Sequence, residues 1–277
     1  MKKIVESHHI RPPPWPSSGS TRSPRDSTDE RTPNPIKRTT VNENERTWNL
    51  LERVLHKPYI QTIFLTGEPG IGKSYAAYTL ATKPGVKIYA VTLTEDTPSA
   101  ELRGFFHLKG QEVDFQLGPF GEAMLCGGRL VINEVGHAPP EVQSLMYAVL
   151  ESPETARLTL PDGRTIRPQP GFKVILTDNG ALDLLPEAIQ DRVDAHFEIK
   201  DAHPKALALM TPRIRRIWET SREISGTKRF SLRDCFRLQN LLRDEKDFGL
   251  DDACYAAFGP KRGPQMHDAI VLMEAAR

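Results

Sequence analysis

The chain has 277 residues, of which 38% are hydrophobic and 26% are charged, and its formal net charge is +1 at pH 7. This length can hold one large and one smaller domain, and the near-neutral charge argues against a dedicated nucleic-acid surface. Three widely spaced cysteines exclude a disulfide framework and a zinc ribbon, and the lack of a long apolar stretch or signal-peptide core predicts a soluble cytoplasmic protein without a membrane segment.

Residues 1–42 differ in composition from the rest of the chain. Seven prolines lie between His8 and Thr40, mixed with Ser, Thr, Arg and Asp and with almost no aliphatic residues. Such a segment cannot bury enough apolar area to offset its chain entropy, so it is predicted to be a disordered tail. Two interpretations stay open: a solvated extension, and a tether that docks a partner through Trp15 and the prolines or contacts acidic surfaces through its basic residues.

After this tail, predicted helices and strands alternate. Apolar positions at helical spacing predict a helix over 44–56, before the first strand. Short apolar or β-branched runs predict strands over the ranges 62–66, 86–91, 129–133 and 172–177. Short strands separated by helices indicate a parallel sheet that is covered on both faces. In such sheets, ligands bind at the carboxyl ends of the strands.

A complete phosphate-loop motif, G-x-x-x-x-G-K-[ST], follows the first predicted strand and precedes a helical stretch. Its glycines let backbone N–H groups point at a β-phosphate, the Lys73 ammonium can reach the β- and γ-phosphates, and the Ser74 hydroxyl can ligate Mg²⁺. The alternative, a glycine turn that matches by chance, is rare between a strand and a helix. The predicted nucleotide-binding residues are Gly67, Glu68, Pro69, Gly70, Ile71, Gly72, Lys73, Ser74 and Tyr75.

Polar residues at the ends of two further strands are candidate catalytic groups. The third predicted strand ends in Asn133 and Glu134, where nucleotide hydrolases place a metal-linked acid and a carboxylate that orients the attacking water. Glu134 suits the second role because a carboxylate can accept a hydrogen bond from water and take its proton. Asn179, after the fourth strand, can donate to a γ-phosphate or hold the water. Alone, Asn179 before a glycine also fits a simple turn.

The remaining elements are a short helix, a hairpin and a group of helices. The helical stretch 185–192 ends in Arg192, which on its own fits an ordinary salt-bridged surface residue. Alternating residues on either side of an Asp-Gly pair predict a β-hairpin over 158–166. Beyond Asp201 the pattern predicts only helices, over 204–210, 212–224, 231–243, 251–258 and 264–276.

The run at 133–144, Asn-Glu-Val-Gly-His-Ala-Pro-Pro-Glu-Val-Gln-Ser, is similar to the run Asp-Glu-Ile-Asn-Arg-Ala-Pro-Pro-x-x-Gln-Ser of a known family. Together with the phosphate loop, it makes the chain resemble the AAA+ ATPases, and more closely the MoxR-like group and its CbbQ/NorQ and McrB relatives. Residues 104–119 look like the hairpin insertion of that group. The resemblance implies an α/β fold: a P-loop core with a five-stranded parallel sheet flanked by helices over 43–200, and a small helical lid domain over 201–277.

The resemblance also assigns roles to residues and implies partners. Asn179 is similar to sensor 1, and Arg233 to the sensor 2 arginine of a lid helix. Arg233 equally fits an exposed arginine in the first turn of a helix capped by Ser231. Arg192 stands at the place of the arginine finger, which reaches into the neighbouring subunit's site and stabilises charge on the γ-phosphate. The implied assembly is a homo-oligomer, a hexamer that binds ATP and Mg²⁺, and MoxR-like proteins are often partnered with a von Willebrand A domain protein.

One departure from the family pattern concerns the metal site. The family's metal-linked Asp is Asn133 here, and the following Asn-Arg pair is Gly136-His137. An amide oxygen can accept a hydrogen bond from a Mg²⁺-bound water, but it brings no negative charge to offset the metal. Because the phosphate loop and Glu134 remain, we expect hydrolysis that is slowed more than abolished.

Two functions from different classes are compatible with these features. The first is an enzyme, a ring-forming Mg²⁺-dependent ATPase that remodels a protein partner, with the catalytic residues Lys73, Glu134, Asn179 and Arg192. The second is an ATP-dependent assembly switch or nucleic-acid clamp, in which Asn133 keeps hydrolysis negligible. A McrB-like motor would need a separate nuclease. Neither the tail nor the hairpins identify a target.

Overall fold

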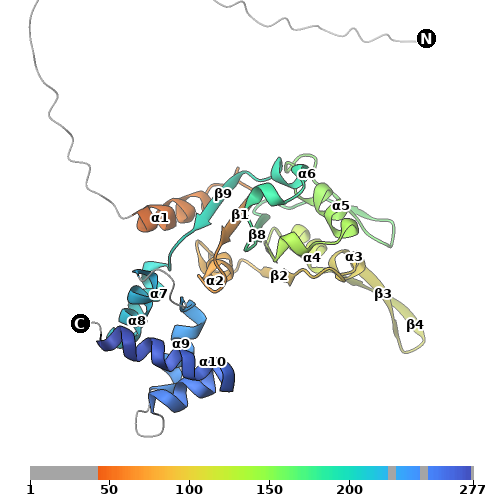
Figure 1. Cartoon of the computed structure of the whole chain (residues 1–277). Coiled ribbons are helices and arrows are strands. Elements are labelled where there is room, and N and C mark those ends of the chain that lie inside the picture. Colours follow the sequence, from red (N-terminus) through yellow and green to blue (C-terminus); the bar gives the residue numbers. More distant parts are fainter. Residues whose placement is uncertain (1–42, 224–228, 244–248, 276–277) are drawn as a thin grey trace, which may run out of the picture. The chain divides into compact units, whose positions relative to one another are not determined.

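A five-stranded parallel sheet forms the centre of the computed structural model (Figure 1). Its strand order is β2-β5-β8-β1-β9, and the bounds are β1 (Thr62–Gly67), β2 (Ile88–Thr92), β5 (Arg129–Asn133), β8 (Lys173–Thr177) and β9 (Ala195–Ile199). The structure describes residues 43–223, 229–243 and 249–275, all within one compact unit. The tail predicted over 1–42 lies outside the described residues.

The predicted parallel sheet is confirmed, with changes at its margins. The four strands named from the sequence appear with their ends shifted by at most two residues. The fifth, β9, is an edge strand that pairs with β1, and the pattern along the chain indicated no strand there. On β9 the buried residues Phe197 and Ile199 alternate with exposed ones, which is typical of a strand covered on one face.

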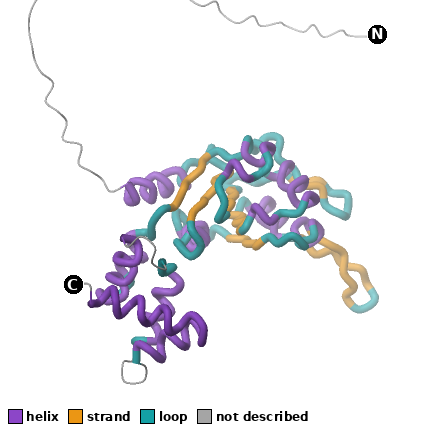
Figure 2. The backbone as a smooth tube through the Cα atoms, in the orientation of Figure 1, coloured by secondary structure: helices purple, strands orange, loops and turns teal. Residues whose placement is uncertain are grey.

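Helices flank the sheet (Figure 2), and those before the last strand are α1 (Glu43–Leu55), α2 (Lys73–Thr79), α3 (Ser99–Arg103), α4 (Pro119–Cys126), α5 (Pro140–Val149) and α6 (Glu187–Gln190). Successive residues of the central strands enter different apolar clusters. On β1, Ile63 and Leu65 pack with residues of α1 and α2, whereas Phe64 packs with residues of α4 and α5. Burial on both faces explains why the central strands are almost continuously apolar.

The chain after β9 is helical, as predicted, with α7 (Pro204–Ala208), α8 (Pro212–Glu223), α9 (Leu232–Leu241) and α10 (Leu250–Ala275); we call these helices the C-terminal helical region. Ser231 and Asp234 form a capping box at the start of α9. Within α10, Gly259 has a φ of 76°, so the helix is interrupted between the two helices predicted over 251–258 and 264–276. None of the helices that the structure describes is long and apolar enough to cross a membrane.

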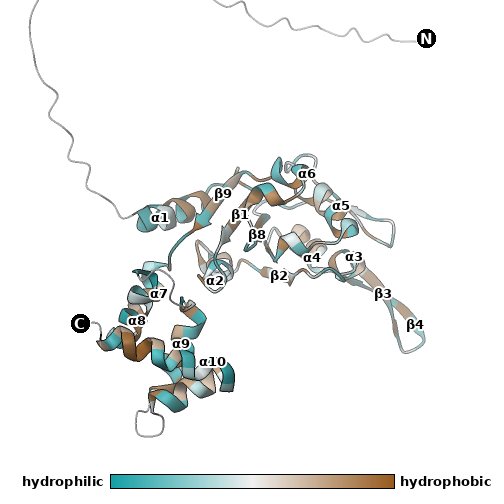
Figure 3. Ribbon diagram, in the orientation of Figure 1, coloured by the Kyte–Doolittle hydropathy of each residue, from teal (hydrophilic) through white to brown (hydrophobic). Residues whose placement is uncertain are grey.

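Two β-hairpins lie outside the central sheet. The pair β6 (Leu158–Thr159) and β7 (Thr165–Ile166) confirms the hairpin predicted over 158–166. The pair β3 (Gly104–Lys109) and β4 (Glu112–Leu117) lies between α3 and α4 in the chain, within the predicted insertion 104–119. Figure 3 shows hydrophobic colours near the base of this second hairpin and hydrophilic colours at its tip.

A buried arginine fixes α2 against the sheet. Arg129, the first residue of β5, donates to the carbonyl oxygens of Ala77 at 3.0 Å and Leu80 at 2.8 Å. It also donates to the Thr82 hydroxyl at 2.9 Å. Carbonyl groups at the C-terminal end of a helix lack intrahelical partners and carry partial negative charge. Arg129 therefore caps the helix that follows the phosphate loop.

Thiol reactivity tests the placement of the three cysteines. Cys126 is exposed, whereas Cys235 and Cys254 are buried. Burial raises the pKa of the Cys235 thiol to about 12 and the pKa of the Cys254 thiol to about 11, and only the thiolate reacts readily. We expect one thiol to react rapidly with Ellman's reagent at pH 8 in the native protein, and all three in guanidinium chloride. Rapid reaction of a second thiol in the native state would contradict this placement.

Candidate nucleotide-binding site

The carboxyl ends of three neighbouring strands meet at one edge of the sheet. Thr177, at the end of β8, pairs in register with Asn133 of β5 on one side and with Leu65 of β1 on the other. The loops that follow these strands hold the phosphate loop, Glu134 and Asn179. The parallel topology therefore gathers the predicted site residues at the edge where such sheets bind ligands.

The phosphate loop connects β1 to α2 and depends on its glycines. Gly70 and Gly72 have φ values of 73° and 106°, in the left-handed region that glycine adopts without steric cost. A Cβ on Gly67 would lie 2.2 Å from the carbonyl oxygen of Ile199 on β9. The first N–H groups of a helix have no intrahelical partner, so this loop and the start of α2 can offer backbone donors to an anion.

Lys73, the first residue of α2, is buried next to this loop. Its ammonium donates to the carbonyl oxygens of Gly67 at 2.7 Å and Glu68 at 3.0 Å, and to Oδ1 of Asn179 at 2.8 Å. Burial lowers the pKa of Lys73, and the nearby carboxylates, first among them Glu134, oppose this shift. All three ammonium protons are thus engaged by uncharged acceptors, which a phosphate group can displace because a charged acceptor binds more strongly.

Asn179 links Lys73 to the end of β5. Its Nδ2 donates to Oε2 of Glu134 at 3.0 Å while its Oδ1 accepts from Lys73. Glu134 has a left-handed backbone, with φ 55° and ψ 49°, a conformation that costs a non-glycine residue about 1–2 kcal/mol. The structure therefore joins three of the four predicted catalytic residues in one chain of hydrogen bonds, with Glu134 held in a strained position at its end.

Asp178 organises the loops around this chain, although sequence reasoning assigned it no role. Its carboxylate accepts from the backbone N–H groups of Gly136 at 2.6 Å and Gly180 at 2.7 Å. A Cβ on Gly136 would lie 3.0 Å from Asp178 Oδ2. Glycine at this position, where the similar family has Asn, therefore lets the Asp178 carboxylate approach the backbone closely. Asp178 thereby ties the segment after Glu134 to the segment that carries Asn179.

Asn133 is buried in a polar network rather than exposed at the edge. Its Nδ2 donates to the Val91 carbonyl oxygen and to the Tyr78 hydroxyl, each at 3.2 Å, and its Oδ1 accepts from the Thr177 hydroxyl at 3.0 Å. Because the Val91 carbonyl can only accept, the amide nitrogen must face it. Oδ1 keeps one lone pair that this network does not use. That lone pair could accept a hydrogen bond from a water bound to a metal ion.

We expect Asn133→Asp to lower the free energy of unfolding by about 1–3 kcal/mol. An aspartate would place an acceptor against the Val91 carbonyl oxygen, where the wild type has a donor. Urea denaturation measures the change, with Asn240→Asp as the control because Asn240 is exposed and should change the stability by less than about 0.5 kcal/mol. An unaltered denaturation midpoint for Asn133→Asp would contradict this orientation of the amide.

A cavity of about 630 Å³ lies over the phosphate loop, within the usual range of about 300–1,000 Å³ for small-molecule sites. The predicted site residues in its wall are Pro69, Gly70, Ile71, Gly72, Lys73, Ser74, Tyr75, Glu134, Asn179 and Arg233. The other predicted residues, Gly67, Glu68, Asn133 and Arg192, are not part of this wall. The structure thus brings most of the predicted site into one cavity and leaves out four of its members.

Aromatic residues from α1 and the C-terminal helical region complete the wall, among them Trp48, His203 and Phe236. The rings of Trp48 and His203 lie 4.9 Å apart, and His203 Nδ1 accepts from the backbone N–H of Lys205 at 3.0 Å. Burial, together with nearby Lys205, lowers the pKa of His203, and the charge of Glu52 opposes this shift. Such an apolar, aromatic wall suits a nucleobase.

Arg192 follows α6 in the chain, and its side chain contacts α5 and α6 outside the cavity. Its guanidinium donates to the carbonyl oxygens of Tyr147 at 3.1 Å and Ala188 at 2.6 Å, and it forms an ion pair with Glu151. The Arg192 side chain is 25% exposed. Within one chain this arginine is therefore engaged away from the cavity, and Arg233 is the predicted arginine that lines it.

The residues at the cavity are suited to a nucleotide-bound Mg²⁺. Among the residues that the structure describes, no group of three or more His, Cys, Asp or Glu residues could hold a metal by itself. Mg²⁺ at such sites takes most of its ligands from water and phosphate and only one or two from the protein. Ser74 is exposed and lines the cavity, so its hydroxyl is available for one of them.

These features define a P-loop α/β fold with a candidate nucleotide site: a parallel sheet covered by helices, a glycine-rich loop followed by a buried lysine, and a carboxylate and an amide at adjacent strand ends. Residues 62–193 match the sequence family described as "AAA domain (dynein-related subfamily)", a stretch just under half of the chain. The matched segment contains the phosphate loop, Glu134, Asn179 and Arg192. Arg233 lies beyond the matched residues.

Curated relatives with similar sequences are known from staphylococci. An uncharacterized protein of Staphylococcus haemolyticus is 32% identical over 166 residues, which are 57% of this chain and 62% of that protein. An uncharacterized protein of Staphylococcus aureus strain USA300 is 33% identical over 141 residues, which are 48% of this chain and 53% of that protein. The chain thus spans between half and two thirds of the length of these relatives.

Solved structures resemble the chain at low sequence identity. NtrX from Brucella abortus in complex with ATP is 17% identical, with a TM-score of 0.49, over 85% of this chain and 67% of that chain. A putative ATPase from Cytophaga hutchinsonii is 20% identical, with a TM-score of 0.45, over 59% of this chain and 50% of that chain. A RuvB mutant of Thermotoga maritima is 15% identical, with a TM-score of 0.46, over 84% and 68% of the two chains.

Proposed function

We propose that the protein binds ATP with Mg²⁺ in this cavity and hydrolyses it in order to remodel a protein partner in the cytoplasm. The observation that carries the proposal is the chain of hydrogen bonds from Lys73 through Asn179 to Glu134. It connects the group suited to phosphate binding with the carboxylate suited to water activation. The match of residues 62–193 to an AAA domain family supports the same function.

Each group has its own task in this proposal. Lys73 exchanges its carbonyl acceptors for phosphate oxygens, and Glu134 accepts a hydrogen bond from water and takes its proton during attack on the γ-phosphate. Asn179 orients Glu134 and can donate to the γ-phosphate. Mg²⁺, held by the Ser74 hydroxyl and through a water by Asn133 Oδ1, would neutralise charge on the phosphate oxygens.

The proposed assembly is a homo-oligomeric ring, a hexamer, in which Arg192 acts on the nucleotide of the neighbouring subunit. The exposed fraction of Glu151, 38%, supports this role because a neighbour can compete for either member of the Arg192–Glu151 pair. Mass photometry with and without a nonhydrolysable ATP analogue tests the assembly. A strict monomer at all concentrations would contradict a role in trans.

Steady-state phosphate release is the test of the enzymatic proposal. Purified protein with ATP and Mg²⁺ should release phosphate, and an excess of EDTA should reduce the rate to that of buffer, because the phosphate charge is then no longer neutralised. Release that never exceeds the rate of the Glu134→Gln variant would favour a protein that binds ATP without hydrolysing it.

A second candidate function is an ATP-dependent assembly switch or nucleic-acid clamp. The observation in its favour is Asn133, which brings no negative charge and whose amide hydrogens are both engaged by Tyr78 and Val91. Mobility-shift assays over a range of salt concentrations separate a clamp from a protein remodeller, because phosphate contacts lose affinity as salt rises. Retention of a von Willebrand A domain protein in the presence of ATP would instead support the remodeller.

A further inference from the structure

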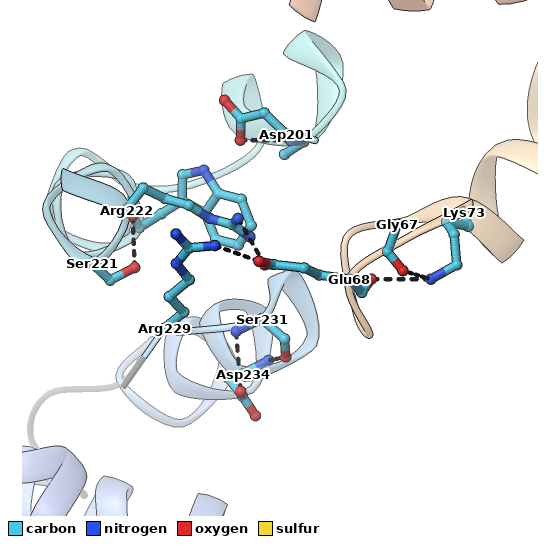
Figure 4. Close-up of polar contacts among 11 residues, drawn as sticks. Gly67, Glu68, Lys73, Asp201, Ser221, Arg222, Arg229, Ser231 and Asp234 are labelled. Carbon is cyan, nitrogen blue, oxygen red and sulfur yellow. Dashed lines mark hydrogen bonds and ion pairs between the residues drawn. The ribbon is translucent and has the colours of Figure 1, made fainter. Parts of the chain in front are cut away.

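Glu68 joins the phosphate loop to the C-terminal helical region. It follows Gly67 at a position that the motif leaves variable, and its side chain points away from Lys73 and toward Arg222 and Arg229 (Figure 4). Arg222 Nη1 lies 3.0 Å from Glu68 Oε2, and Arg229 Nη1 donates to Glu68 Oε1. One carboxylate of the loop is therefore paired with two arginines from the other end of the chain.

Packing orients the first of these arginines. The Arg222 guanidinium lies 4.2 Å from the centroid of the Trp218 ring. Trp218 is 1% exposed, and the Arg222 side chain is 17% exposed. A guanidinium stacked on a buried aromatic ring loses much of its rotational freedom. The contact with Glu68 is consequently better ordered than an ordinary ion pair on the surface, where two long side chains must be immobilised.

Backbone contacts beside this ion pair bring α9 onto the phosphate loop. The N–H of Leu232 donates to the carbonyl oxygen of Gly70 at 2.9 Å. A Cβ on Gly70 would lie 2.5 Å from Cβ of Ser231, the residue that caps α9. The first turn of α9 therefore lies directly against the loop that Glu68 belongs to.

This same turn carries Arg233, which lines the nucleotide cavity. A carboxylate on a loop that binds a polyanion would by itself repel that ligand. The presence of Glu68 in this loop therefore needs another explanation. We propose that Glu68 is a positioning residue, which docks α9 on the phosphate loop and so holds Arg233 in the nucleotide cavity. The proposal rests on the proposed function, since Arg233 acts only on nucleotide bound there.

The Glu68→Gln variant distinguishes a docking role from a purely electrostatic effect of the carboxylate, because the two predict opposite changes in nucleotide affinity. Loss of the negative charge alone should tighten nucleotide binding, whereas loss of docking should weaken it. Isothermal titration calorimetry with AMP-PNP and Mg²⁺ should show the Kd rising about fivefold, the low end of typical coupling between sites. The control Glu95→Gln removes an exposed charge that lies outside the loop and should leave the Kd unchanged.

The Arg233→Ala background tests whether Glu68 acts through Arg233. In that background Glu68→Gln should leave the Kd for AMP-PNP unchanged or lower it, because no arginine remains to be positioned. Two results would overturn the proposal: tighter binding by the single variant Glu68→Gln, or an equal loss of affinity in both backgrounds.

Hydrogen exchange of the nucleotide-free protein measures the docking itself. Peptides that cover 229–235 should exchange at least about tenfold faster in Glu68→Gln, because the Leu232 N–H is released from Gly70 when the first turn of α9 opens. Exchange at the wild-type rate would overturn the docking role. If the wild type bound no AMP-PNP while the variant still exchanged faster, the docking contact would stand and the nucleotide function would fail.

Discussion

Phosphate release by the Glu134→Gln variant is expected to be at least about 100-fold slower than by the wild type, the low end of what a general base contributes. Glutamine keeps an oxygen that can accept from Asn179, so the side chain can stay in place. An amide cannot take a proton from water, and this is the step that should fail. ATP affinity should be unchanged or slightly higher, because one negative charge near the phosphates is lost.

Two further measurements make this result specific to the carboxylate. Glu187→Gln, at an exposed position on α6, should hydrolyse ATP at the wild-type rate, which excludes a general effect of net charge. Calorimetry with AMP-PNP should show that the Glu134 variant still binds nucleotide. A Glu134→Gln protein with more than about a tenth of the wild-type rate would show that another group activates the water.

The sequence predicted the centre of this site because two local rules agree there. The glycines and lysine of the phosphate loop fix one peptide segment, and short apolar strands place Glu134 and Asn179 at the edge that adjoins it. Parallel topology then brings these segments together without further information. This edge brings Lys73, Asn179 and Glu134 near one another. The hydrogen bonds that join them could be seen only in the structure.

Residues that act through contacts distant in the sequence were not predictable. Asp178 is followed by Asn179 and Gly180, a sequence typical of a turn, and its bond to Gly136 spans 42 positions. Glu68 fills a variable place in its motif, and its partner arginines are 154 and 161 positions away. A local pattern says nothing about such partners, since the polar residues involved fit an exposed turn equally well.

The wall of the cavity and the edge of the sheet also depend on contacts between residues that are distant in the sequence. Trp48 reads in the sequence as an apolar position of an amphipathic helix, and only the fold shows that it also meets His203 at the cavity. In strand β9 buried residues alternate with exposed ones, so its hydrophobic pattern is weaker than that of the buried strands.

Nucleotide affinity should fall by at least about 30-fold when Lys73 is replaced with Met, because loss of one partner of a desolvated charge pair costs about 2–5 kcal/mol. Methionine has a similar length and no charge. The chain should stay folded, since the ammonium that it replaces is itself buried against its preference and has its pKa lowered for that reason. Calorimetry with AMP-PNP measures the affinity, and thermal unfolding measures the fold.

The affinity for AMP-PNP and the unfolding temperature together distinguish a phosphate-binding role of Lys73 from a structural one. A lysine with only a structural role would lower the unfolding temperature and leave the affinity of the folded variant unchanged, whereas a phosphate-binding lysine lowers the affinity of a variant that is still folded at the measuring temperature. Lys83→Met serves as the matched control because Lys83 is exposed after α2 and should change neither quantity. Wild-type affinity in Lys73→Met would remove the phosphate loop from the proposed site, and with it the ATP-dependent functions of both candidates.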